Sequence, residues 1–171
     1  MVGTKINLNG ENTSMKINDI LYKIQKALSL ENKKIIEAYA LVEYEMSEER
    51  LQNILKKHQD EGYEDATYEE LGLFLDGLVI LKIGVSSKVN DEDEVVELTN
   101  NLILKKIRVA MELKEVELII LFALAEVNIT KRQIGSLFRK EGSKNFKVCS
   151  DELLMAFLDG LEEFYYDGEE V

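Results

Sequence analysis

Two aspartates occupy matching positions in a five-residue stretch that occurs twice. The residues Phe-Leu-Asp-Gly-Leu stand at 74–78 and again at 157–161, so Asp76 and Asp159 share one sequence setting. Paired carboxylates can bind a cation or move a proton in acid–base catalysis. If the two copies met across the protein, the aspartates would form a symmetric pair. This is the one arrangement in the sequence that would support an enzyme.

The glycine of the repeated stretch favours a structural role instead. A glycine inside a helix costs about 1 kcal/mol relative to alanine, so its recurrence requires a reason. Close approach of a neighbouring helix provides one. We therefore expect four packing residues, Phe74, Gly77, Phe157 and Gly160. Carboxylate chemistry at the two aspartates stays as the exception to a non-enzymatic interpretation.

The single cysteine and the single histidine offer little chemistry. Cys149 directly precedes an expected helix start, a position that favours the thiolate, but a catalytic cysteine also needs a base. His58 lies in the other half of the chain, and the residue that matches Cys149 there is Ala66. We expect a small buried residue at both of those positions and a surface position for His58. No catalytic, cofactor-binding or metal-binding residue is assigned, and we expect no cofactor.

Six basic residues gather between residues 130 and 147, opposed there only by Glu141. They are candidate contacts for a nucleic acid or for an acidic partner: Lys131, Arg132, Arg139, Lys140, Lys144 and Lys147. Two helices joined by a short turn in this region loosely suggest a helix-turn-helix. The matching segment 47–64 mixes both charges, so the basic surface is not repeated. A solvated helix face is the plainer interpretation.

The overall charge argues against a polyanionic partner. The 171 residues include 33 acidic and 21 basic ones, which gives a net charge of −12, and residues 88–98 alone hold five acidic residues and one lysine. Phosphate backbones and anionic membranes repel such a chain as a whole, although a local basic surface can override the average. No apolar run reaches the roughly 18 residues of a membrane span. We expect a cytoplasmic protein that does not bind membranes.

The chain is a tandem repeat. A shift of 83 positions aligns residues 18–78 with residues 101–161 without a gap and with 19 identities in 61 positions. This predicts a flexible extension at 1–14, a first repeat at 15–87, an acidic connector at 88–98 and a second repeat at 99–171.

Each repeat reads as four helices. In the first repeat, apolar residues recur at helical spacing, which predicts helices near 18–28, 32–41, 48–57 and 68–83. In the second repeat, the last three helices are expected near 115–125, 131–140 and 151–166. The helix at 115–125 is apolar nearly all round, which predicts burial on most sides. The fold class is therefore all-α, with about eight helices in two similar halves that pack together about a pseudo-two-fold axis.

The spacing of several motifs resembles that of the YehS-like family of bacterial cytoplasmic proteins, whose function is uncharacterised. The resemblance rests on Asn-Asp-Ile-Leu at 18–21, Asn-Leu-Ile-Leu-Lys-Lys-Ile-Arg at 101–108, and Asn-Phe-Lys-Val-Cys-Ser-Asp-Glu-Leu-Leu at 145–154. It covers about residues 15–165. The resemblance implies a fold of two tandem helical repeats and a cytoplasmic location, and it implies no catalytic residues.

The sequence favours a non-enzymatic protein-interaction or regulatory module. No nucleophile, base or metal-ligand set converges in it, and the groove between the halves, near the fourth helices, is the expected site for a partner protein. The alternative is a nucleic-acid-binding regulator that uses the basic segment of the second repeat. A homo-oligomer is compatible with the sequence.

Overall fold

The computed structural model describes residues 15–84 and 97–166, and these form eight helices and no strand. The first repeat holds α1 (Ile17–Leu28), α2 (Asn32–Leu41), α3 (Glu48–Ile54) and α4 (Tyr68–Ile83). The second holds α5 (Asn100–Met111), α6 (Glu115–Leu124), α7 (Lys131–Leu137) and α8 (Asp151–Phe164). The expected all-α fold of two four-helix repeats is confirmed. The expected extension at 1–14 and most of the expected connector lie outside the described residues.

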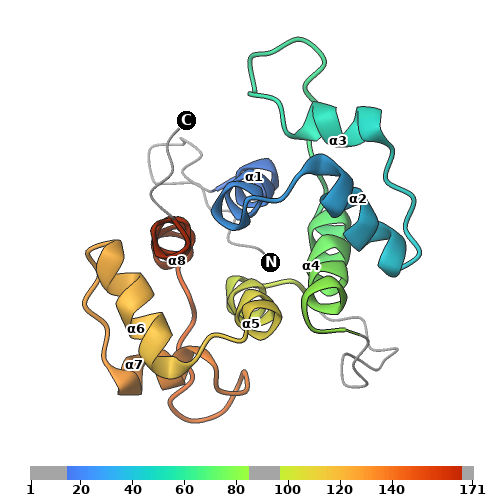
Figure 1. Ribbon diagram of the computed structural model, residues 1–171. Coiled ribbons are helices and arrows are strands. Elements are labelled where there is room, and N and C mark those ends of the chain that lie inside the picture. The colour runs from blue at the N-terminus through green and yellow to red at the C-terminus, as the bar shows by residue number, and fades with distance from the viewer. Residues whose placement is uncertain (1–14, 85–96, 167–171) are drawn as a thin grey trace.

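The two repeats exchange their first helices. The helix α1 packs chiefly against α8, and α5 packs chiefly against α4, so each first helix lies on the fourth helix of the other repeat. Figure 1 shows α1, α4, α5 and α8 grouped at the centre, with α2 and α3 on one side and α6 and α7 on the other. A shift of 83 residues maps the contact of α1 with α8 onto the contact of α5 with α4. This correspondence is the expected pseudo-two-fold relation. The buried residues of both repeats consequently form one core.

One asparagine in each repeat fixes the segment that leads into the fourth helix. Asn18 donates from Nδ2 to the carbonyl oxygens of Ile54 and Glu64, and its Oδ1 accepts from the amide of Ala66. Asn101 makes the same three contacts one repeat later, with the carbonyls of residues 137 and 147 and the amide of residue 149. These bonds satisfy backbone groups that a loop would otherwise leave unpaired. They explain why each repeat opens on asparagine.

The two glycines of the repeated stretch lie where helices touch backbone to backbone. A Cβ atom on Gly77 would stand 2.6 Å from the carbonyl carbon of Ala38 in α2, and closer still to its oxygen. A Cβ atom on Gly160 would stand 2.9 Å from the carbonyl carbon of Leu121 in α6. Phe74 and Phe157 are fully buried one turn earlier in the same helices. The two glycines thus let α2 lie against α4 and α6 against α8.

Candidate functional site

The two aspartates of the repeated stretch each pair with a lysine of the other repeat. Lys23 in α1 contacts Asp159 in α8 at 2.8 Å between Nζ and Oδ1, and Lys106 in α5 contacts Asp76 in α4 through the same atoms. The two pairs correspond under the shift of 83 residues. They join the exchanged helices, so the structure gives both carboxylates a role in holding the repeats together.

All six residues of the basic segment are exposed, and none of them forms an ion pair with another residue of the described chain. The segment covers α7 and the loop that follows it. Arg139 and Lys140 also border a hollow of about 820 Å³, to which Lys105 of α5 and the rings of Phe138 and Phe146 contribute. Mixed charges line this hollow, because Glu97, Glu141 and Asp151 face it as well.

Cys149 does not have the thiolate character that its position before a helix suggested. The residue is buried, and burial, followed by the negative charge of Asp151, raises the pKa of the thiol to about 12. Its counterpart Ala66 is buried as well. His58 is exposed and lies edge-on to the ring of Tyr63, with 5.0 Å between the ring centroids. The structure therefore does not bring the cysteine and the histidine together.

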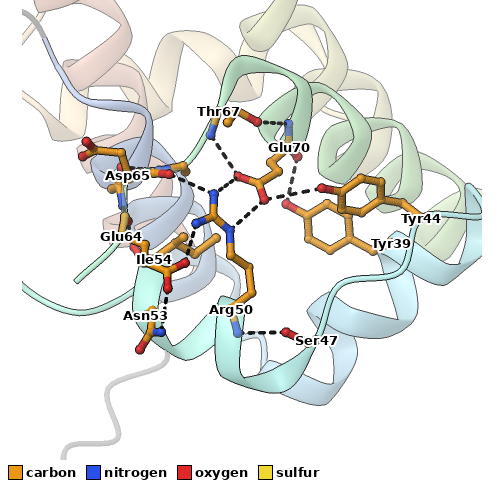
Figure 2. Close-up of polar contacts among 12 residues, drawn as sticks. Tyr39, Tyr44, Ser47, Arg50, Asn53, Ile54, Glu64, Asp65, Thr67 and Glu70 are labelled. Atoms are coloured by element: carbon orange, nitrogen blue, oxygen red, sulfur yellow. Dashed lines mark hydrogen bonds and ion pairs between the residues drawn. The ribbon is translucent and has the colours of Figure 1, made fainter. Parts of the chain in front are cut away.

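A cluster that the sequence analysis missed surrounds Arg50 in the first repeat (Figure 2). The guanidinium donates to both carboxylate oxygens of Glu70, at 2.9 and 2.8 Å, and also to Glu64. Glu70 is 4% exposed and exchanges the two hydrogen bonds of a capping box with Thr67 at the start of α4. The hydroxyl of Tyr39 donates to the backbone carbonyl of Glu70 at 2.8 Å.

These contacts keep both glutamates of the cluster ionised. Burial acts to raise the pKa of Glu70, but hydrogen bonds from Arg50 and from the Thr67 amide outweigh it, so this pKa lies below its ordinary value. Hydrogen bonds from Arg50 and then from Asn53 lower the pKa of Glu64. Because both carboxylates already accept from one arginine, the cluster acts as a structural tie between α3 and α4. The second repeat has glutamine, lysine and leucine in place of Arg50, Glu64 and Glu70.

The apolar helix α6 is not buried on most sides, and that expectation was wrong. Val116, Ile120 and Leu124 are 56, 46 and 45% exposed, whereas Leu121 and Phe122 of the same helix are fully buried. These three exposed side chains are four residues apart in the sequence. They therefore form a single stripe about 12 Å long on the outer face of the helix. We call these three residues the α6 stripe. In α2 the matching residues are lysine, glutamate and leucine, at 33, 37 and 41.

A hollow of about 560 Å³ opens between the two repeats at the C-terminal end of the α6 stripe. Leu124 belongs both to the stripe and to its wall. Its apolar lining residues are Met15 and Leu124 together with Met155 and two alanines of the second repeat. All of the charged residues that line it are acidic, namely Asp19, Glu126, Asp151, Glu152 and Asp159. We call this site the acidic hollow.

Asp151 is the unusual member of the acidic hollow. It is 7% exposed, and its Oδ1 accepts from Nδ2 of Asn100 at 2.8 Å. Its Oδ2 is buried and has no hydrogen-bond partner among the described residues. The Oδ1 of Asn100 is likewise buried without a hydrogen-bond partner among the described residues. Asn100 lines the hollow beside Arg139, and Asp151 lines both hollows, so this oxygen does not belong to the acidic hollow alone.

The other junction between the repeats has a different chemistry. Under the shift of 83 residues, Asp19 corresponds to Leu102 and Asp151 to Tyr68, while Met15 and Met155 correspond to Leu98 and Gly72. At that other junction, Leu102 and Tyr68 thus stand in place of two of the acidic residues that line the hollow. The pairs Glu126 with Glu43 and Glu152 with Glu69 are identical in type and exposed in both repeats. The acidic hollow is a property of the α1, α6 and α8 junction.

Two features are absent from the described residues. Within residues 15–84 and 97–166, no three histidine, cysteine, aspartate or glutamate side chains converge as metal ligands would. No helix in those ranges combines the length and the apolar character needed to cross a bilayer.

Comparison with known sequences places the chain in a family. The sequence model described as "Protein of unknown function (DUF1456)" matches residues 18–84 and 100–165, one match for each repeat. The chain belongs to this family. The two DUF1456 matches together include all eight helices except the first residue of α1, and they exclude the connector.

A relative supports the same assignment. The chain is similar to the uncharacterized protein YehS of Escherichia coli strain K12, with 29% identity over 147 residues that cover 86% of this chain and 94% of YehS. The resemblance to a YehS-like family is therefore confirmed. No solved structure matches the chain significantly.

Proposed function

We propose that this DUF1456 protein is a cytoplasmic protein-binding module without catalytic activity of its own, and that its partner binds across the α6 stripe and the acidic hollow. The observation that carries the proposal is the exposure of Val116, Ile120 and Leu124 on one helix face. An apolar stripe with a spacing of four is the feature that helix-in-groove and helix-on-helix recognition uses. Exposed contiguous apolar surface on a folded domain marks interaction sites.

The difference between the repeats supports this assignment. The helix α2 has the same place in its repeat as α6, but it presents Lys33 and Glu37 where α6 presents Val116 and Ile120. Packing against the core explains why the inner faces of both helices are apolar. It does not account for an apolar outer face that spans three residues in α6 but is limited to Leu41, the last residue, in α2. A partner that covers α6 would bury that face.

Site-specific photo-crosslinking tests the proposal. A photoreactive amino acid replaces Ile120 in the full chain, and the matched control carries it at Glu37, the same position in α2. In cells of the source organism, we expect a discrete crosslinked protein from position 120 that is absent from position 37. Equal crosslinking from both positions, or none from position 120, would contradict the proposal. A product that contains only a second copy of this chain would reassign the stripe to a homo-oligomer.

Nucleic-acid binding is the second candidate function. It is favoured by six exposed basic residues without ion pairs among the described residues, and by the hollow that Arg139 and Lys140 border. Cations that are not neutralised by the protein itself are available to phosphates. The net charge of −12 opposes this function.

The salt dependence of oligonucleotide binding tests the second candidate. Binding of a fluorescent single-stranded or double-stranded oligonucleotide should weaken steeply between low and moderate salt, because phosphate contacts release counterions. The double variant Arg139→Glu with Lys140→Glu should abolish it. Absence of binding at low salt would remove this candidate.

A further inference from the structure

The acidic hollow and the α6 stripe form one continuous surface with two kinds of chemistry. Leu124 ends the stripe and lines the hollow, so a ligand that follows the stripe reaches the acidic side chains directly. Five acidic residues line the hollow beside Met15 and Met155, and one of the five, Asp159, already pairs with Lys23. A matching ligand must therefore present apolar groups along a line of about 12 Å and a cationic group at one end.

The arrangement of the acidic side chains narrows the choice of cationic group. The acidic side chains of the hollow do not converge in the way that metal ligands would. Carboxylates that do not converge on one point suit a group with several N–H donors that point in different directions. A guanidinium has five such donors and an ammonium has three.

We infer that the partner binds through a basic amphipathic helix, whose apolar face covers the α6 stripe and whose arginine or lysine enters the acidic hollow. This inference rests on the proposed function and names the chemistry of the partner. The charge of −12 on this chain favours a cationic partner at long range, and the hollow fixes where the cation binds. Arginine fits better than lysine, because its planar fork can bridge two carboxylates.

Methionine methyl NMR on the full chain provides the test. Of the five methionines, Met15 and Met155 line the hollow, whereas Met46 and Met111 lie elsewhere. The probe is a synthetic amphipathic helix of about 18 residues, long enough to be partly helical in water. It carries leucines at a spacing of four and two arginines at one end. A second peptide replaces both arginines by glutamine.

The arginine peptide should shift the methyl signals of Met15 and Met155 and leave Met46 and Met111 unchanged. The glutamine peptide should bind at least about tenfold more weakly, since roughly 1.4 kcal/mol corresponds to that factor. Equal affinity of the two peptides, or equal shifts at all four methyl groups, would overturn the inference.

Two double variants with the same change of net charge complete the test. Glu126→Gln with Glu152→Gln removes two carboxylates from the hollow, and Glu43→Gln with Glu69→Gln removes their counterparts in the first repeat. All four glutamates are exposed, so both proteins should fold. The hollow variant should lose about fivefold or more in affinity for the arginine peptide, and the control should stay within about twofold. Equal losses would mean non-specific attraction and would overturn the inference.

The crosslinking experiment separates this inference from the proposed function. If position 120 captures a partner whose binding is unaffected in the hollow variant, the protein-binding function at the α6 stripe stands and the inference of a cation in the hollow fails. If position 120 captures no protein, the proposed function fails first.

Discussion

The ammonium group of Lys23 lies 2.8 Å from Oδ1 of Asp159 and joins the first helix of one repeat to the last helix of the other. Lys106 and Asp76 form the corresponding pair on the other side of the pseudo-two-fold axis. The aspartate of the repeated Phe-Leu-Asp-Gly-Leu stretch therefore has a partner in both repeats. It marks the exchange of helices on which the whole core depends.

Reversing one charge of this contact should lower stability, and reversing the second charge as well should restore part of the loss. Asp159→Lys should lower the free energy of unfolding by about 0.5–1 kcal/mol, the range of exposed ion pairs, and added Lys23→Asp should restore part of it. Urea unfolding of the two single variants and the double variant gives the coupling energy. A coupling of zero at low salt would show that the contact contributes nothing to stability.

Alanine at the helix-crossing glycines should be strongly destabilising. Gly77→Ala would drive a methyl group into the backbone of Ala38, so α2 must move away from α4, at a cost of about 2 kcal/mol or more. Gly135 in α7 is the matched control, because a methyl group there meets nothing within 4 Å. Gly135→Ala should be neutral or stabilising by up to about 1 kcal/mol. Thermal unfolding of both variants makes the comparison, and equal midpoints would refute close packing at Gly77.

The first repeat alone should not form a stable monomer. In a fragment of residues 15–84, α1 would lack α8 and α4 would lack α5, so the apolar faces of both helices would be exposed. Circular dichroism during heating should show no cooperative transition for the fragment, or a transition that depends on concentration because two fragments pair. A concentration-independent cooperative transition would mean that the exchanged contacts are not required for folding.

Much of this fold was predictable from the sequence, whereas the exchange of helices was not. The periodicity of residues 18–28 identifies a helix and its buried face, and the shift of 83 residues identifies the duplication. The two first helices, however, present nearly the same apolar residues, so either fourth helix could receive either of them. The lysine retained at 23 and 106 and the aspartate retained at 76 and 159 indicate a contact between first and fourth helices. Because both repeats hold both residues, they do not show that the contact crosses between the repeats.

The candidate site was less accessible to sequence reasoning. A groove between the halves was expected, but the apolar character of 115–125 was taken to mean burial, because periodicity cannot show that an all-round apolar helix has a solvent-facing side. The Arg50 cluster was missed because Arg50 and Glu70 lie 20 positions apart and the counterparts of the cluster in the second repeat differ in type. Comparing Val116 with Lys33 and Ile120 with Glu37 would have pointed to the stripe.

Acid should weaken the protein through the Arg50 cluster. The folded state holds the pKa of Glu70 below its ordinary value of 4.5, so its contribution is complete above that pH and is lost as the pH falls through the lower value. Glu70→Gln should cost about 1–3 kcal/mol at pH 7, because it breaks a buried charged hydrogen bond, and should flatten the loss of stability in acid. Denaturant unfolding between pH 7 and about pH 3 tests this. The exposed neighbour Glu69→Gln should change stability by less than about 0.5 kcal/mol.

The affinity of the partner captured at position 120 tests the central claim most directly. Titration calorimetry compares the unaltered chain with Ile120→Lys on the α6 stripe and with Leu41→Lys in α2. Leu41 is the counterpart of Leu124 and is 41% exposed. Burying a lysine in place of isoleucine at the interface should weaken binding at least about tenfold, and the α2 variant should stay within about twofold. Unchanged affinity for Ile120→Lys, or equal losses for both variants, would contradict the assignment of the α6 stripe as the binding surface.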